Sequence, residues 1–180
     1  MPSRWCRMTE GERMATLRVA VIVVSDRAAS GERPDATGPR LRDMLQSRDA
    51  QVTEIQVVPD EQQRIADVLL ELCGRADVVL TAGGTGLAAR DVTPEATAAV
   101  IERTVPGIAE AMRAAGLRST PHAMLSRAIA GVRDGSLIIN LPGSPGGAAE
   151  SLAAVWEALS HAVAVIKRPV ADDEHAPRRG

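Results

Sequence analysis

The strongest constraint on the fold is an alternation of short apolar runs with longer segments of helical periodicity. Residues 18–24, Arg-Val-Ala-Val-Ile-Val-Val, form a run rich in β-branched side chains, and similar runs occupy 52–58, 77–81 and 136–141. Continuous apolar runs are typical of strands that are buried on both faces of a parallel sheet. The sequence therefore predicts an α/β fold with a mostly parallel sheet.

Helical patterns lie between these runs. Thr93 is a suitable N-cap for one helix, Pro94 suits its first turn, and Glu95 favours the positive end of its dipole. Right-handed crossovers place such helices on both faces of the sheet. The other helices are expected over 39–48, 61–73, 106–115, about 120–130, and a long final segment that carries an apolar stripe over 152–166.

The length of 180 residues predicts one domain. Hydrophobic residues make up 45% of the chain and charged residues 24%, which is typical of a globular protein and disfavours a disordered one. We expect a single domain over 17–168, because the segments outside it are polar and lack periodicity. Residues 1–16 are then a flexible extension and 169–180 a flexible tail.

Composition disfavours several classes of function. The net charge is −2 and the chain has two Trp but no Tyr or Phe, so we expect no nucleic-acid partner. Cys6 and Cys73 are isolated and the three histidines lack ligand spacing, which disfavours a disulfide framework or a zinc site. No apolar run reaches membrane-span length and no signal-peptide layout is present, so a cytoplasmic protein without a membrane partner is expected.

Two glycine-rich loops follow predicted strands, Gly-Gly-Thr-Gly at 83–86 and Pro-Gly-Ser-Pro-Gly-Gly at 142–147. Glycine lets backbone N–H groups approach an anion closely, and ligands of parallel sheets bind beyond the carboxyl ends of the strands. The alternative is a tight turn or a simple connector. Residues 84–89 also fit a dinucleotide-binding pattern, but the helix start at Thr93 comes too late for it. No Gly-Lys-Ser/Thr occurs, and Lys167 is the only lysine.

Asp60 closes the predicted strand over 52–58 and Asp91 follows the first glycine loop, so both are expected at this same edge. Two carboxylates beside anion-binding loops suit Mg²⁺, which binds through one or two carboxylates plus substrate phosphates. The alternative is that each aspartate caps the helix after it. Asp26 and Asp35 are weaker candidates, because loop solvation explains them.

Other polar residues have plain explanations. Arg27, Arg90 and Arg127 supply positive charge or form surface ion pairs, and Ser126 falls in an apolar segment where it can bond its own helix. No Ser-His-Asp or Cys-His arrangement indicates a covalent nucleophile. The pattern predicts a phosphate-handling α/β domain that performs phosphoryl or nucleotidyl transfer by positioning and electrostatics.

Residues 80–97, Leu-Thr-Ala-Gly-Gly-Thr-Gly-Leu-Ala-Ala-Arg-Asp-Val-Thr-Pro-Glu-Ala-Thr, closely resemble the signature of the molybdopterin adenylyltransferases, the Mog/MoaB family. Further matches span about 18–167. They are Val-Ser-Asp-Arg at 24–27, Val-Pro-Asp-Glu at 58–61, Val-Pro-Gly at 105–107, Leu-Ser-Arg at 125–127 and Asn-Leu-Pro-Gly-Ser at 140–144.

The resemblance implies a three-layer α/β/α sandwich that assembles as a homotrimer. It implies transfer of AMP from ATP to the terminal phosphate of molybdopterin, with release of pyrophosphate, in molybdenum cofactor biosynthesis. A separate molybdenum insertase then receives the product. The alternative is a weakly active or inactive MoaB-type paralogue that serves as a pterin-binding or scaffold subunit, and retention of both Asp60 and Asp91 favours the enzyme.

The resemblance also assigns roles. Asp60 and Asp91 match the family's functional aspartates and would hold Mg²⁺, and Ser126 matches its pterin-side serine. Two departures stand out: Ala82 replaces a common Thr or Ser, and 145–147 lacks the lysine that several relatives carry. The residues expected to bind substrate or nucleotide are Gly83, Gly84, Thr85, Gly86, Ser126, Asn140, Pro142, Gly143 and Ser144.

Overall fold

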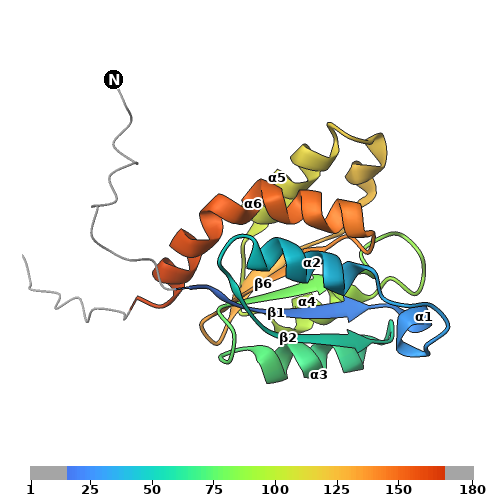
Figure 1. The fold of residues 1–180 in the computed structure, drawn as a ribbon, viewed down its shortest axis with the longest axis horizontal. Coiled ribbons are helices and arrows are strands. Elements are labelled where there is room, and N and C mark those ends of the chain that lie inside the picture. Colours follow the sequence, from blue (N-terminus) through green and yellow to red (C-terminus); the bar gives the residue numbers. More distant parts are fainter. Residues whose placement is uncertain (1–15, 169–180) are drawn as a thin grey trace, which may run out of the picture.

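A six-stranded sheet forms the centre of the computed structural model, which describes residues 16–168 (Figure 1). Its strand order is β2-β1-β3-β6-β5-β4. The first four strands in this order are parallel, and β5 and β4 continue the sheet antiparallel. The strands are β1 Arg18–Val24, β2 Gln51–Val58, β3 Val78–Ala82, β4 Arg103–Thr104, β5 Ala130–Arg133 and β6 Ser136–Leu141.

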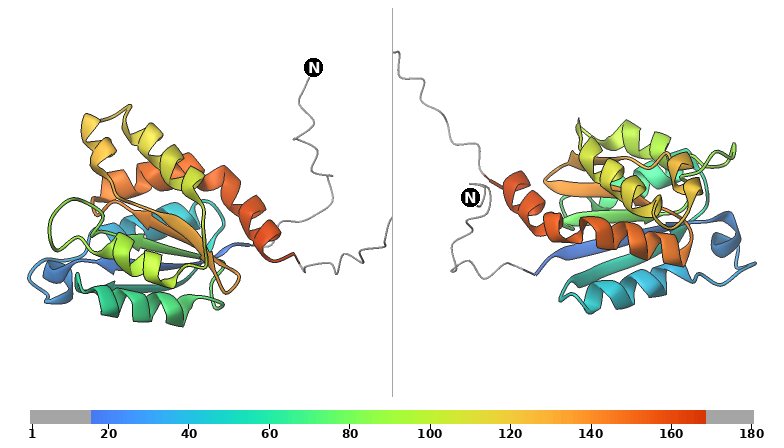
Figure 2. Two further views of the ribbon diagram at one scale, coloured as in Figure 1. Left: turned by 180° about the vertical axis from the view of Figure 1, so that it is seen from behind. Right: turned by 90° about the horizontal axis from the view of Figure 1, so that it is seen from above.

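Helices cover both faces of the sheet, which confirms the three-layer α/β/α fold (Figures 1 and 2). One face carries α2 Thr37–Gln46, α5 Pro106–Gly116 and α6 Pro145–Ile166. The opposite face carries α3 Gln62–Leu72 and α4 Thr93–Val100.

The β1 strand shows why the apolar runs are continuous. Val21 and Val23 point into the core beneath α2 and α6, whereas Ile22 and Val24 point into the core beneath α3 and α4. Because successive side chains of a strand point to opposite faces, a strand covered on both faces needs an apolar residue at every position.

The long final helix α6 is apolar enough to resemble a membrane span, with a mean hydropathy of 1.3 over its most apolar window. Leu152, Val155, Leu159 and Val163 are nevertheless buried in the core beside β6. One stripe of α6 therefore packs against the sheet, as in an amphipathic helix that covers a sheet face.

The expected helix around 120–130 is wrong. A short 3-10 helix, η1 Pro121–Leu125, is followed by irregular chain that leads into β5. The reason is tertiary: the N–H of Arg127 donates to the carbonyl of Thr85 at 2.9 Å instead of to its own segment. The two antiparallel strands were not predicted either.

A short helix, α1 Asp26–Ala29, replaces part of the expected loop after β1, and Ser25 caps it by accepting from the N–H of Ala28 at 3.3 Å. The third strand begins at Val78, one residue later than predicted. Residues 1–15 of the expected extension over 1–16, the expected tail over 169–180 and the prediction for Cys6 lie outside the described residues.

Lys167 lies far from the glycine loops. It caps the end of α6, and its Nζ pairs with Asp77 at the amino end of β3, where Arg18 Nη2 also bonds Asp77 Oδ1 at 2.9 Å. The glycine loop 83–86 follows the opposite end of that strand. Lys167, which the sequence alone could not place, therefore lies away from the candidate site.

Candidate functional site

The first glycine loop needs glycine for geometric reasons. Gly83 and Gly84 have φ values of 118° and 61°, a region that L side chains rarely adopt. A Cβ at Gly83 would overlap the carbonyl of Val24, and a Cβ at Gly84 would overlap the hydroxyl of Thr93. The chain therefore comes into close contact with its surroundings here, and α4 begins only at Thr93, as the argument against a dinucleotide-binding loop required.

The second loop lies against the first. A Cβ at Gly143 would stand 3.2 Å from the Cα of Gly83, so the two loops touch through their backbones. The hydroxyl of Thr37 donates to the carbonyl of Gly143 at 2.9 Å, and Ser144 caps α6 by accepting from the N–H of Gly147 at 3.2 Å. This loop thus acts as a connector and also forms a wall of the site.

Two cavities meet at these loops. The first, of about 460 Å³, lies between the loops, α5, η1 and α6, and the second, of about 410 Å³, lies between the loops, α1 and the start of α2. Gly84, Gly143 and Ser144 line both cavities. Asp91 lies on the first cavity and Asp60 on the second. The other predicted residues on the first cavity are Thr85, Gly86, Ser126 and Pro142, and Gly83 lies on the second.

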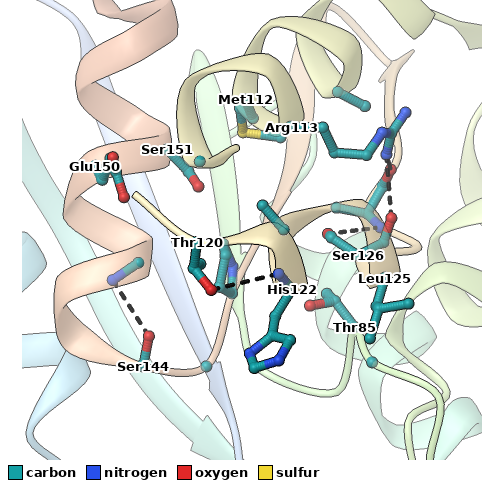
Figure 3. Close-up of a pocket in the computed structure, with 18 of the residues that line it drawn as sticks. Thr85, Met112, Arg113, Thr120, His122, Leu125, Ser126, Ser144, Glu150 and Ser151 are labelled. Carbon is teal, nitrogen blue, oxygen red and sulfur yellow. Dashed lines mark hydrogen bonds between the residues drawn. The ribbon is translucent and has the colours of Figure 1, made fainter. Parts of the chain in front are cut away.

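Figure 3 shows the walls of the first cavity, some of which the sequence did not indicate. Met112 and Arg113 come from α5, Glu150 and Ser151 come from α6, and His122 of η1 lies between them. These positions resemble those of any amphipathic helix, so no sequence signal could single them out. They line a cavity only because α5 packs beside α6.

Asp60 does not cap α3, which disproves the capping alternative there. Its Oδ2 accepts from the N–H of Asp26 at 2.9 Å, and Asp26 Oδ1 accepts from the N–H of Asp60 at 3.0 Å. Burial raises the pKa of Asp60, and the nearby charges of Asp26 and Asp91 add to this. Arg90 bonds Asp26 and lowers the pKa of that carboxyl. Asp26, a weaker candidate from sequence, therefore contacts the site through Asp60, although it lines neither cavity.

Asp91 is not a helix cap either. Its Oδ2 accepts from the N–H of Ala88 at 2.8 Å, which closes the turn that follows the first glycine loop. The predicted N-cap Thr93 is also wrong, because Val92 occupies that position and Thr93 is the first helical residue. The N–H of Thr93 donates to the carbonyl of Gly84 at 3.1 Å, so the glycine loop fixes its place.

The two aspartates fit a divalent cation. Each uses one carboxylate oxygen to accept a backbone N–H, and within residues 16–168 the other oxygen accepts no hydrogen bond. Asp60 Oδ1 lies 3.1 Å from the position of a Gly84 Cβ, and Asp91 Oδ2 lies 2.9 Å from that of a Gly86 Cβ. No group of three potential metal ligands occurs in this part of the chain. Two carboxylates without further side-chain ligands match the coordination habit of Mg²⁺.

Ser126 lines the first cavity, whereas Asn140 is buried below it. Ser126 follows η1, lines the first cavity, and accepts from the N–H of Ala128 at 3.3 Å. Asn140 is fully buried and lines neither cavity. Its amide bonds Thr81 at 2.9 Å and Thr97 at 2.8 Å, and its carbonyl accepts from Ile129 at 3.3 Å. Asn140 therefore lies beneath the site and ties β3, α4 and the chain after Ser126 together.

Comparison with known proteins gives a consistent result. Residues 20–161 match the profile of a family described as "Probable molybdopterin binding domain". Molybdopterin adenylyltransferase of Helicobacter pylori J99 is 41% identical over 157 residues, covering 85% of this chain and 89% of the relative. The enzyme of the same name from Escherichia coli K12 is 43% identical over 154 residues, covering 83% of this chain and 79% of that relative.

Solved structures agree with these relatives. The molybdopterin biosynthesis enzyme MoaB of a Thermus species superposes with a TM-score of 0.79 at 50% identity, covering 84% of this chain and 96% of that one. The Mog protein of Mycobacterium ulcerans superposes with a TM-score of 0.79 at 38% identity, covering 84% of this chain and 99% of that one. The resemblance to this family is thus confirmed, and the chain belongs to the Mog/MoaB family of molybdopterin-binding proteins.

Proposed function

We propose that this protein is a molybdopterin adenylyltransferase of molybdenum cofactor biosynthesis, which transfers AMP from ATP to the terminal phosphate of molybdopterin. The observation that carries the proposal is the pair of cavities that share one glycine wall, with Asp91 on one and Asp60 on the other. Two substrates in such cavities would bring their phosphates together at that wall. The names of the relatives support the same activity.

The proposed reaction needs no side chain as a nucleophile. A terminal phosphate oxygen of molybdopterin attacks the α-phosphorus of ATP, and the bond from that phosphorus to the bridging oxygen breaks. The electron pair leaves with pyrophosphate. Because the phosphate nucleophile is already anionic at neutral pH, no strong general base is required. Catalysis then rests on alignment and on stabilisation of the spreading negative charge.

Molybdopterin is assigned to the first cavity and the nucleotide to the second. The first combines Ser126 with the apolar side chains of Met112 and Leu125, a mixture that suits a flat heterocycle with a few polar atoms. The second brings Asp60 to the start of α2, and its two glycine loops offer backbone N–H groups to phosphates. Gly84 and Gly143, where the cavities meet, are the proposed place of transfer.

Asp60 and Asp91 would hold Mg²⁺, which when bound offsets the charge of the triphosphate. In this chain Asp26 orients Asp60 through their reciprocal bonds, and the N–H of Ala88 orients Asp91. Burial raises the pKa of Asp60, and the nearby charges of Asp26 and Asp91 add to this, so a bound cation would offset the cost of keeping this carboxylate charged.

The wider setting is proposed on the same basis. We expect a cytoplasmic homotrimer that passes its product to a molybdenum insertase. Leu87 is 66% exposed and Met124 63%, and both lie beside segments that border the first cavity. Exposed apolar side chains of this kind are suited to contact with another protein surface.

The test is incubation with molybdopterin, ATP and Mg²⁺, followed by mass detection of adenylyl-molybdopterin and measurement of pyrophosphate. Both products are expected in equal amounts, and neither should form without molybdopterin. Tight pterin binding without any product would instead support the pterin-binding or scaffold subunit.

A further inference from the structure

Arg127 makes an unusual set of contacts with the first glycine loop. Its Nε donates to the carbonyl of Gly86 at 2.7 Å, and its Nη2 donates to the carbonyl of Asp91. Its backbone N–H donates to the carbonyl of Thr85 at 2.9 Å. Its Nη1 also pairs with Glu95 of α4. One residue therefore binds three carbonyls of the segment 85–91.

These contacts fix more than the carbonyls. In a trans peptide the C=O and the next N–H point in opposite directions. Holding the carbonyls of Thr85 and Gly86 therefore also orients the N–H groups of Gly86 and Leu87. A planar guanidinium with several donors can hold separate carbonyls at once, whereas a single ammonium cannot match that geometry.

The other side of Arg127 is anchored as well. Arg113 of α5 donates to the carbonyl of Ala128 at 3.0 Å and to that of Ser126 at 3.3 Å (Figure 3). Asn140 accepts from the N–H of Ile129 at 3.3 Å. The chain around Ser126 is therefore held firmly, and the Arg127 side chain extends from it to the loop that carries Asp91.

We propose that Arg127 is a positioning residue that fixes the glycine loop and Asp91 relative to Ser126, and so aligns the two substrates for AMP transfer. The inference rests on the proposed function, because it places molybdopterin in the cavity that Ser126 and Asp91 both line, and uses Asp91 together with Asp60 to hold the Mg²⁺ of the triphosphate. A misplacement of about 1 Å can cost roughly a hundredfold in rate, so a clamp at this point governs turnover.

A surface ion pair with Glu95 is the competing explanation, and it makes a different prediction. Three variants separate the two: Arg127→Met, Arg127→Lys and the matched control Glu95→Gln. Arg127→Lys keeps the positive charge but loses the planar guanidinium that bonds two carbonyls at once. Glu95→Gln removes the ion pair but leaves the contacts of Arg127 with the carbonyls in place.

Single-turnover formation of adenylyl-molybdopterin and equilibrium binding of molybdopterin are measured for each variant. We expect both Arg127 variants to lose at least about tenfold in rate, with molybdopterin affinity within about threefold, and Glu95→Gln to stay near wild type. Full activity of Arg127→Lys would contradict the proposed positioning role of Arg127. A rate loss in Glu95→Gln equal to that of the Arg127 variants would contradict it as well.

Hydrogen exchange of the peptide that contains 83–91 supplies a readout that does not depend on activity. Exchange of this peptide should become faster in Arg127→Lys and stay unchanged in Glu95→Gln. Unchanged exchange in Arg127→Lys would refute the proposal, and this holds even if Arg127→Met does not fold. If the wild type forms no product, the proposed function fails, whereas this measurement still decides whether Arg127 holds the loop.

Discussion

Two threonines of α4 are equally buried but differ in hydrogen bonding. Thr93 and Thr97 are both fully buried. The Thr97 hydroxyl accepts from Asn140 at 2.8 Å, whereas that of Thr93 has no partner among the described residues. A buried polar group without a partner costs about 1–3 kcal/mol, so its presence beside Gly84 is a local cost in stability.

Valine at each position should therefore act in opposite directions. Thr93→Val removes the unpaired hydroxyl at nearly constant shape and should raise the free energy of unfolding by about 1 kcal/mol. Thr97→Val leaves an Asn140 donor unpaired and should lower it by about 1–3 kcal/mol. Urea unfolding measures both. Shifts of the same sign would show that the two hydroxyls are in equivalent surroundings.

Asp91→Asn tests the charge of the proposed cation ligand. The amide oxygen can still accept from Ala88, so the turn and molybdopterin binding should persist. Loss of one electrostatic contact should slow adenylylation by about a hundredfold or more. Asp67→Asn on the exposed face of α3 changes the net charge equally and should leave the rate unchanged. A rate within a few-fold of wild type would remove Asp91 from the mechanism.

At the scale of elements, the first glycine loop can be tested against a loop of similar backbone. Gly84 and Gly31 have φ values of 61° and 76°, but only at Gly84 would a Cβ meet other atoms. Gly84→Ala should lose most activity because the loop must shift away from Thr93. Gly31→Ala carries only the backbone strain of about 1–2 kcal/mol and should keep its activity. Equal activity in the two variants would contradict a close-fitting loop; thermal melting controls for folding.

Strands β1, β3 and β6 of the parallel part were predictable because they are covered on both faces, whereas the edge strand β2 is mostly half-buried or exposed. The antiparallel part was not predictable: β4 has two residues, and β5, Ala-Gly-Val-Arg, carries almost no pattern. The expected helix around 120–130 failed because the hydrogen-bond partner of Arg127 is Thr85, far away along the chain. Local periodicity cannot report such a partner.

The site was predictable to a similar degree. Asp60, Asp91 and both glycine loops follow strands, so the rule about carboxyl ends brings them together, as the structure does. Asn140 obeys the same rule but points into the interior. Arg113 and Glu150 line the first cavity through packing of one helix against another, which spacing within either helix does not reveal.

At the scale of the whole molecule, Asp77 joins the first described strand to the end of the last helix. Burial disfavours its charge, but hydrogen bonds from Arg18 and Lys167 outweigh this and lower its pKa. A depressed pKa contributes stability above the ordinary aspartate value near 3.8, and this is lost as pH falls through the folded-state value. The free energy of unfolding of the wild-type protein should therefore exceed that of the Asp77→Asn variant at neutral pH. Urea titrations should show the difference narrow below about pH 4, and a constant difference would contradict the assignment.

Assembly is a second property of the whole molecule. The exposed Leu87, Met124 and Leu125 and the family resemblance predict a homotrimer. Light scattering at micromolar concentration should give three times the mass of one chain. A monomer would contradict this prediction, and a stable hexamer would indicate the MoaB-type arrangement.

The shared glycine wall has a consequence for what happens after transfer. In the proposed function each substrate occupies one cavity, so the joined product would span both. Linking two separately held fragments makes the second contact intramolecular, so the joined molecule dissociates more slowly than either part. Release of the joined product would then require both halves to dissociate together. The proposed function therefore predicts that the glycine wall at which the two phosphates meet also retains the joined product.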